Sequence, residues 1–190
     1  MKKRIAILAS GAGSNAQHII QYFQTKDSAD VVLVGSNNPD ALALKKAARL
    51  GVSWFVFNKS ELTTLSLVLD RLLAERVDII VLAGFLLKVP DSLVKAFPNR
   101  IINIHPALLP KFGGRGMYGK HVHDAVIKAQ ERESGITIHY VNKHYDDGAT
   151  IFQAKCRVSE NDDVETLAKK ISVLEREHFA KTIDQIIKTL

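Results

Sequence analysis

The chain has 190 residues, 46% of them hydrophobic, and its length and apolar content predict one globular domain over residues 1–190. The single cysteine, Cys156, excludes an internal disulfide and a cysteine-based zinc cluster, and it favours a reducing cytoplasm. No apolar run approaches the ~20 residues of a membrane helix, and the net charge of +6 comes from scattered Lys and Arg residues, a pattern that suits anionic small substrates better than nucleic acid.

Strand-like apolar runs recur in the first part of the chain. They cover residues 4–10, 31–36, 54–57, 78–85 and 100–105. Apolar residues at helical spacing lie between these runs, and they predict helices around 16–23, 41–48, 65–73 and 90–97. Helices that alternate with strands apolar on both faces indicate a parallel sheet covered on both sides.

The pattern changes after residue 110. GGRGMYGKHVH (113–123) is rich in Gly and His and predicts a long loop, either a lid or an ordered surface excursion. A helix around 122–131 is expected next, and then two strands, 137–142 and 150–158, on either side of a DDG turn. A closing helix begins near Val164. The predicted fold is therefore α/β, a Rossmann-like, mostly parallel sheet with helices on both faces and an antiparallel C-terminal extension.

The segment SGAGSNA (10–16) joins the first strand to the first helix and predicts an anion site. Gly11 and Gly13 permit a tight backbone, and the free N–H groups at the start of a helix favour a phosphate. With Ala16 they also fit a dinucleotide fingerprint, which requires an acid at the end of the second strand. Residues 36–38 are Ser-Asn-Asn instead. A single phosphate, as on a ribose 5-phosphate, is thus favoured over NAD and over a merely tight turn.

A second candidate site lies in IINIHP, where Asn103 and His105 are two residues apart in a strand. Such residues point to the same face, at the strand end where open parallel sheets bind ligands. An amide can donate to a developing oxyanion, and an imidazole can supply or accept a proton. Asp146, in a later turn, could pair with His105, raise its pKa and fix its orientation. Asp147 is the alternative partner.

These motifs together resemble those of the glycinamide ribonucleotide formyltransferases. The resemblance rests on SGAGSN, on VLAGF at 81–85, on NIHPALLP at 103–110 and on YDDGA at 145–149, and it covers essentially the whole chain. It implies the formyltransferase fold and a folate-dependent enzyme of purine synthesis. The ribonucleotide phosphate would bind at the first glycine loop, and the co-substrate 10-formyltetrahydrofolate in a neighbouring cleft. Small-molecule substrates are the expected partners, with the protein a monomer or a homodimer.

The resemblance also implies roles for individual residues. The catalytic residues of the family match Asn103, His105 and Asp146. Those that contact the substrate phosphate and ribose match Gly13, Ser14, Asn15 and Glu175, and Glu177 fits the ribose position less well by spacing. The folate-binding residues match Leu86, Leu87, Lys88, Val89, Asn103, Val141 and His144.

The implied reaction is attack of the substrate amine on the formyl carbon. Asn103 and protonated His105 would stabilise the negative charge on the formyl oxygen, and Asp146 would keep His105 protonated. Three features depart from the family pattern. The acid motif is usually Asp-Gly-Gly-Pro, whereas residues 146–149 are Asp-Asp-Gly-Ala, and the folate segment commonly has an arginine where this chain has Leu87. The loop 113–123 is longer than the usual form.

Other interpretations have weaker support. His121 and His123 form an H-x-H pair without a third ligand at suitable spacing, so a structural role is favoured and no metal is expected. Methionyl-tRNA formyltransferases carry a further nucleic-acid-binding domain after the catalytic one, and they are not expected here. Formyltetrahydrofolate deformylase, a hydrolase, and a non-catalytic phosphosugar- or nucleotide-binding module stay open. A binding module would have no need for the combination of Asn103, His105 and Asp146.

Overall fold

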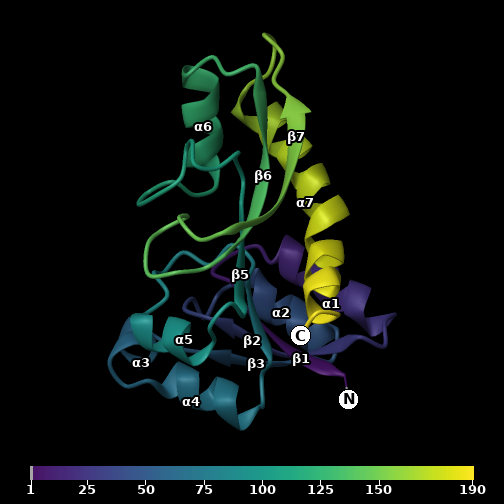
Figure 1. Ribbon diagram of the computed structural model, residues 1–190, viewed down its shortest axis with the longest axis vertical. Coiled ribbons are helices and arrows are strands. Elements are labelled where there is room, and N and C mark those ends of the chain that lie inside the picture. Colours follow the sequence, from purple (N-terminus) through teal and green to yellow (C-terminus); the bar gives the residue numbers. More distant parts are fainter. Residues whose placement is uncertain (1) are drawn as a thin grey trace.

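The computed structural model describes residues 2–190, and a seven-stranded sheet organises this part of the chain (Figure 1). The strand order is β3-β2-β1-β4-β5-β6-β7. The strands are β1 (Lys3–Leu8), β2 (Ala29–Ser36), β3 (Ser53–Val56), β4 (Ile79–Leu82), β5 (Ile101–His105), β6 (Glu133–Tyr140) and β7 (Thr150–Arg157). β1 to β5 are parallel, and β6 and β7 are antiparallel, which confirms the predicted fold class.

Helices connect the strands and cover the sheet. They are α1 (Ser14–Gln24), α2 (Leu42–Arg49), α3 (Lys59–Thr63), α4 (Leu67–Ala74), α5 (Asp91–Ala96), α6 (Lys120–Lys128) and α7 (Val164–Ile187). Among the described residues, no helix combines the length and the apolar character that a bilayer crossing requires.

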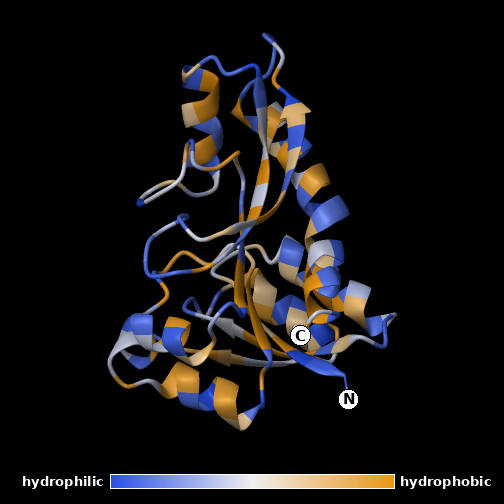
Figure 2. Cartoon of the chain, in the orientation of Figure 1, coloured by the Kyte–Doolittle hydropathy of each residue, from blue (hydrophilic) through white to orange (hydrophobic). Residues whose placement is uncertain are grey.

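The hydrophobic core has two parts, one on each face of the sheet. The apolar faces of α1, α2 and α7 pack on alternate residues of the central strands, such as Ile5 and Ile79. The residues between these, such as Ala6 and Ile80, pack against α3, α4 and α5. Strands buried on both faces read as continuous apolar runs, and the ribbon of β5 is accordingly orange in Figure 2. The apolar runs, bounded by turn residues, were therefore sufficient to locate them.

The antiparallel part extends beyond the parallel sheet, and α7 runs along it (Figure 1). The β5–β6 register places Asn103 opposite His139 and His105 opposite Thr137. The Thr137 hydroxyl donates to the Ala107 carbonyl at 2.7 Å and accepts from the Leu109 N–H at 3.0 Å. Thr137 therefore fixes the segment that follows His105.

Three of the differences between the element boundaries and the sequence predictions have a clear local cause. β4 ends at Leu82 rather than at residue 85, because the chain turns at Gly84 with φ +74°. The Lys59–Thr63 helix was not predicted; its capping box joins Asn58 and Glu61. β6 begins at Glu133 instead of residue 137. The prediction started the strand too late because the Ser134-Gly135 pair resembles a loop in sequence. Gly135 is required there, since an added Cβ would lie 1.9 Å from the Ala154 carbonyl oxygen.

Candidate active site

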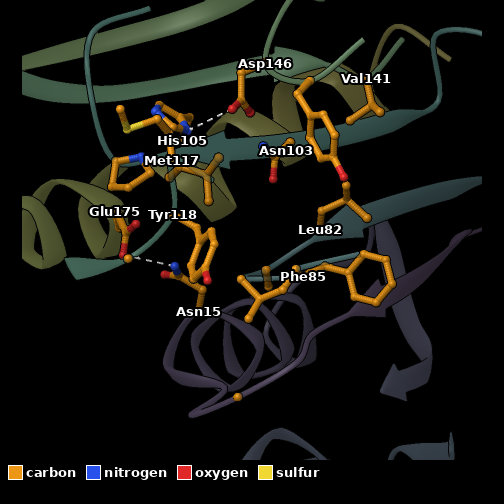
Figure 3. Close-up of a pocket in the computed structure, with 18 of the residues that line it drawn as sticks. Asn15, Leu82, Phe85, Asn103, His105, Met117, Tyr118, Val141, Asp146 and Glu175 are labelled. Atoms are coloured by element: carbon orange, nitrogen blue, oxygen red, sulfur yellow. Dashed lines mark hydrogen bonds and ion pairs between the residues drawn. The ribbon is translucent and has the colours of Figure 1, made fainter. Parts of the chain in front are cut away.

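A cavity of about 700 Å³ opens at the C-terminal ends of β1, β4 and β5 (Figure 3). Open parallel sheets bind ligands at this edge, and the volume is that of an ordinary small-molecule site. Every residue that the sequence assigned to catalysis or binding lines this one cavity. They are Gly13, Ser14, Asn15, Leu86, Leu87, Lys88, Val89, Asn103, His105, Val141, His144, Asp146 and Glu175.

The start of α1 forms one end of the cavity. Gly13 has φ +66°, and an added Cβ would lie 2.4 Å from the Cα of Ala43, so only glycine fits. No side chain caps this end of α1. The first-turn N–H groups at Ser14 and Asn15 border the cavity, an arrangement that favours an anion.

Asn15 and Glu175 form a polar pair beside this end. The Asn15 side-chain amide donates to Glu175 at 3.0 Å (Figure 3). Burial raises the pKa of Glu175, and the Asn15 hydrogen bond opposes that shift. Glu177 does not line the cavity, and its carboxylate Oε2 lies 3.8 Å from Nε2 of His178. The geometry thus favours Glu175 over Glu177 as the acid of this subsite.

His105 and Asp146 approach each other on the side of the site away from Glu175 (Figure 3). His105 Nδ1 lies 3.6 Å from Asp146 Oδ2, and both side chains are largely buried. Asp147 accepts a hydrogen bond from Asn142 and does not line the cavity. Asp146, rather than Asp147, therefore faces the imidazole.

The protonation of His105 differs from the expectation. Burial lowers the pKa of His105, and this effect outweighs the opposing influence of Asp146 and of the Phe112 carbonyl. This direction runs against the expectation that Asp146 keeps the imidazole protonated. Burial would raise the pKa of Asp146, but His139, His105 and the Gly114 N–H hold the net value below the ordinary one.

The hydrogen bonds of His105 fix its tautomer. Nε2 lies 2.8 Å from the Phe112 carbonyl oxygen, which can only accept, so Nε2 carries the proton. In the neutral ring Nδ1 then has a free lone pair, and this nitrogen is the one beside Asp146. The site can therefore take up a proton at Nδ1, where a carboxylate would stabilise the resulting imidazolium.

His139, which the sequence suggested only as a possible folate-pocket histidine, lies in the site beside Asn103. Its Nδ1 lies 2.9 Å from the Tyr140 carbonyl oxygen and so carries a proton. Its Nε2 accepts from the Asn103 amide at 3.1 Å, and the same nitrogen lies 3.7 Å from Asp146 Oδ1. His139 thus orients the amide whose second N–H is left for a ligand. Its signal in the sequence was a histidine in the strand that pairs with β5.

The glycine-rich loop faces the site. Asp146 accepts from the Gly114 N–H at 2.9 Å, so the acid that faces His105 also holds the loop. Arg115, Met117 and Tyr118 line the cavity from this loop, an arrangement that supports the lid interpretation. Residues 120–123 belong to α6, so the loop is shorter than predicted.

The apolar Leu86, Leu87 and Val89 line one wall of the cavity, together with Lys88. The Leu86 N–H donates to the Ser10 hydroxyl at 3.0 Å, which attaches this segment to the end of β1. A second cavity of about 520 Å³ adjoins it, and Lys59, Lys88, Asp91 and Arg115 are its charged lining residues. Lysine and arginine side chains from other positions are thus close to where the family commonly has an arginine at position 87.

Residues 2–190 contain no cluster of three or more His, Cys, Asp or Glu side chains that could hold a metal ion. The ring of His121, part of the H-x-H pair considered as a metal motif, instead makes an edge contact with Tyr118. Cys156 packs against the core, and burial raises the pKa of its thiol.

Comparison with known proteins decides the family. Residues 3–183 match the formyl transferase family. The chain belongs to the formyl transferase family. This assignment agrees with the fold and with the cavity that the sequence motifs line.

Individual members of the formyl transferase family resemble the whole described chain. The chain is 43% identical to a chloroplastic phosphoribosylglycinamide formyltransferase of Arabidopsis thaliana, over 93% of this chain and 62% of that protein. It is 30% identical to the phosphoribosylglycinamide formyltransferase of Bacillus subtilis, over 97% of this chain and 95% of that one. A crystal structure of the enzyme of that name from Anaplasma phagocytophilum has a TM-score of 0.91 and 33% identity, over 100% of this chain and 88% of that one. The chain thus spans less than two thirds of the plant relative.

Proposed function

We propose that the chain is a phosphoribosylglycinamide formyltransferase. It transfers the formyl group of 10-formyltetrahydrofolate to the amine of glycinamide ribonucleotide, a step of purine biosynthesis. The observation that carries this proposal is one cavity with an anion-binding helix start at one end and Asn103, His105 and Asp146 at the other. The plant and bacterial relatives described above bear the name of this enzyme.

The substrate amine attacks the formyl carbon, and the carbonyl electrons move to the formyl oxygen. The free N–H of Asn103 donates to that oxyanion, while His139 holds the amide in orientation. Neutral His105 accepts the proton of the attacking amine at Nδ1, and Asp146 stabilises the imidazolium. The bond between the formyl carbon and the donor nitrogen then breaks, and the proton passes to that nitrogen.

The cavity suits the proposed donor, which supplies an electrophilic formyl carbon. The apolar Leu86, Leu87, Val89 and Val141 line the cavity and offer a surface for the flat pterin. The cationic Lys88 and Arg115 adjoin this wall and suit the carboxylates of the donor. His144 is a further polar lining residue on this side.

Release of tetrahydrofolate from 10-formyltetrahydrofolate tests the proposal. The purified protein is incubated with the donor, with and without glycinamide ribonucleotide. We expect release only when the ribonucleotide is present, together with formylated ribonucleotide. Equal release in its absence would identify a hydrolase, and no release in either mixture would identify a binding module.

The cytoplasm is the proposed compartment, and a monomer or homodimer the proposed assembly. The lone thiol, half-buried on β7, is in keeping with a reducing compartment. Sedimentation equilibrium would distinguish the two assemblies, and a larger species would contradict both.

A further inference from the structure

The second cavity, of about 520 Å³, takes no part in the reaction steps proposed above. Its charged lining consists of three cationic side chains, Lys59, Lys88 and Arg115, and one acidic side chain, Asp91. Within residues 2–190, none of these four side chains forms a salt bridge. The cations are exposed, and the net positive charge that they give the cavity favours an anionic ligand.

Three separate segments supply these cations. Lys59 is the first residue of α3, which its capping box and the buried Leu62 hold in place on the core. Lys88 lies between β4 and α5, and Arg115 lies in the glycine-rich loop. The positive charge thus comes from residues far apart in the sequence, which the fold brings to one cavity.

The two cavities share one wall. The residues that line both are Leu86, Leu87, Lys88, Val89, Arg115 and Tyr145. Asn103, His105 and Asp146 do not line the second cavity, and neither does the glycine turn before α1. A ligand that reacts beside Asn103 therefore reaches the second cavity with a part that extends across residues 86–89, away from the reacting atoms.

The proposed donor has a part with the required charge and position. Its formyl-bearing nitrogen lies between the pterin and a benzoyl group, and the benzoyl group continues into a glutamate. Further glutamates can be joined through the γ-carboxylate, and each of them adds one negative charge. With the pterin on the apolar wall and the formyl group at Asn103, this tail is the part that can cross residues 86–89 toward the cations.

We propose that the second cavity binds the γ-linked glutamate tail of the folate donor, with Lys59, Lys88 and Arg115 as its carboxylate ligands. This inference rests on the proposed function and specifies the form of the donor that the protein prefers, a polyglutamate over a monoglutamate. Lys59 is the most informative of the three residues, because it lines only the second cavity, whereas Lys88 and Arg115 line both.

Titration calorimetry with the monoglutamate and the pentaglutamate of tetrahydrofolate tests the inference without turnover. We expect the wild-type protein to bind the pentaglutamate about tenfold more tightly, since one exposed ion pair contributes up to about fivefold. Added salt should reduce this ratio, because exposed charges are screened. Lys59→Gln should weaken binding of the pentaglutamate about threefold and leave that of the monoglutamate unchanged.

Two further variants complete the test. The triple variant Lys59→Gln, Lys88→Gln, Arg115→Gln should lose the preference for the pentaglutamate. Lys120→Gln is the matched control, because this side chain is exposed and lines neither cavity, so both affinities should equal those of the wild type.

Equal affinity of the wild-type protein for the two forms would overturn the inference, as would a preference that the triple variant retains in full. Either result leaves the proposed function intact, because release of tetrahydrofolate in the presence of glycinamide ribonucleotide tests that function independently. Failure of this release, together with a pentaglutamate preference that Lys59→Gln reduces, would contradict the transferase and still support the tail site.

Discussion

At the scale of single residues, the site consists of polar groups whose hydrogen bonds leave one reactive position each. One side-chain N–H of Asn103 donates a hydrogen bond to His139, and the other N–H is free for a ligand. The Nε2–H of His105 donates a hydrogen bond to the Phe112 carbonyl, and the lone pair of Nδ1 stays free. These backbone and side-chain partners hold the groups in a fixed orientation before any ligand arrives, which is the condition for effective electrostatic stabilisation.

Asn103→Ala should reduce kcat by about 10²–10³, the loss typical of one oxyanion donor. The KM for the ribonucleotide should change little, because the donor acts on the formyl oxygen in the transition state. Steady-state kinetics with both substrates checks this prediction. A variant with near wild-type turnover would show that Asn103 is not the donor.

His105→Ala should lower turnover by about 10²–10⁴, the range of general acid–base catalysis. Binding of ribose 5-phosphate should persist, because the anion site at the start of α1 does not involve this side chain. Single-turnover kinetics and calorimetry on the same preparation separate the two effects. Loss of binding together with turnover would point to misfolding instead of lost chemistry.

Asp146→Asn and Asp147→Asn provide a matched pair at adjacent positions. Asparagine at 146 can still accept from the Gly114 N–H, but it removes the charge that faces His105. We expect a fall in kcat of about 10²–10⁴. The change at Asp147 should be near neutral, because that carboxylate lies outside the cavity. Similar losses at both positions would contradict the assignment of Asp146.

At the scale of elements, the turn between β1 and α1 forms the proposed anion site. Gly13 must be glycine because α2 approaches it closely, and the Ala43 N–H bonds to the Gly11 carbonyl at 3.1 Å. The geometry of the proposed site thus depends on the packing of α2 as well as on the glycine loop itself.

Gly13→Ala should abolish ribose 5-phosphate binding, because its Cβ would collide with α2 and displace the start of α1. The wild-type protein is the reference, because Gly11, the other glycine of this turn, itself lines the cavity. Calorimetric titration of the variant and the wild type checks the contrast. If Gly13→Ala binds as well as the wild type, the anion does not sit on this turn.

How far the sequence could predict the site depends on the distance between partners. Asn103 and His105 lie in one strand, so their common face followed from a spacing of two residues. The contact between His139 and Asn103 depends on the register of β5 with β6, which no local pattern fixes. The sign of the His105 pKa shift depends on burial by segments far apart in the chain. The sequence could therefore predict Asp146 as a partner of His105, but not the direction of the pKa shift of His105.

At the scale of the whole molecule, buried histidines link stability to pH. Burial holds the pKa values of His105 and His123 below the ordinary 6.5 in the folded state. Below about pH 6.5 the unfolded chain therefore binds more protons than the folded one, and the free energy of unfolding decreases as the pH falls.

The melting temperature should accordingly fall as the pH is lowered from 7.5 to about 5. In His123→Asn this fall should be shallower, since one of the two groups is removed. Differential scanning calorimetry across this range provides the measurement. A variant whose melting temperature changes with pH as steeply as that of the wild type would exclude a contribution from His123.

Asp146 Oδ2 lies beside His105 Nδ1 and also accepts a hydrogen bond from the Gly114 N–H. A ligand that orders the glycine-rich loop would therefore also fix the Asp146 carboxylate beside the imidazole, and by thermodynamic reciprocity protonation of His105 would favour the ordered loop. Variants of this loop should be assayed for ligand affinity and for the pH dependence of turnover together.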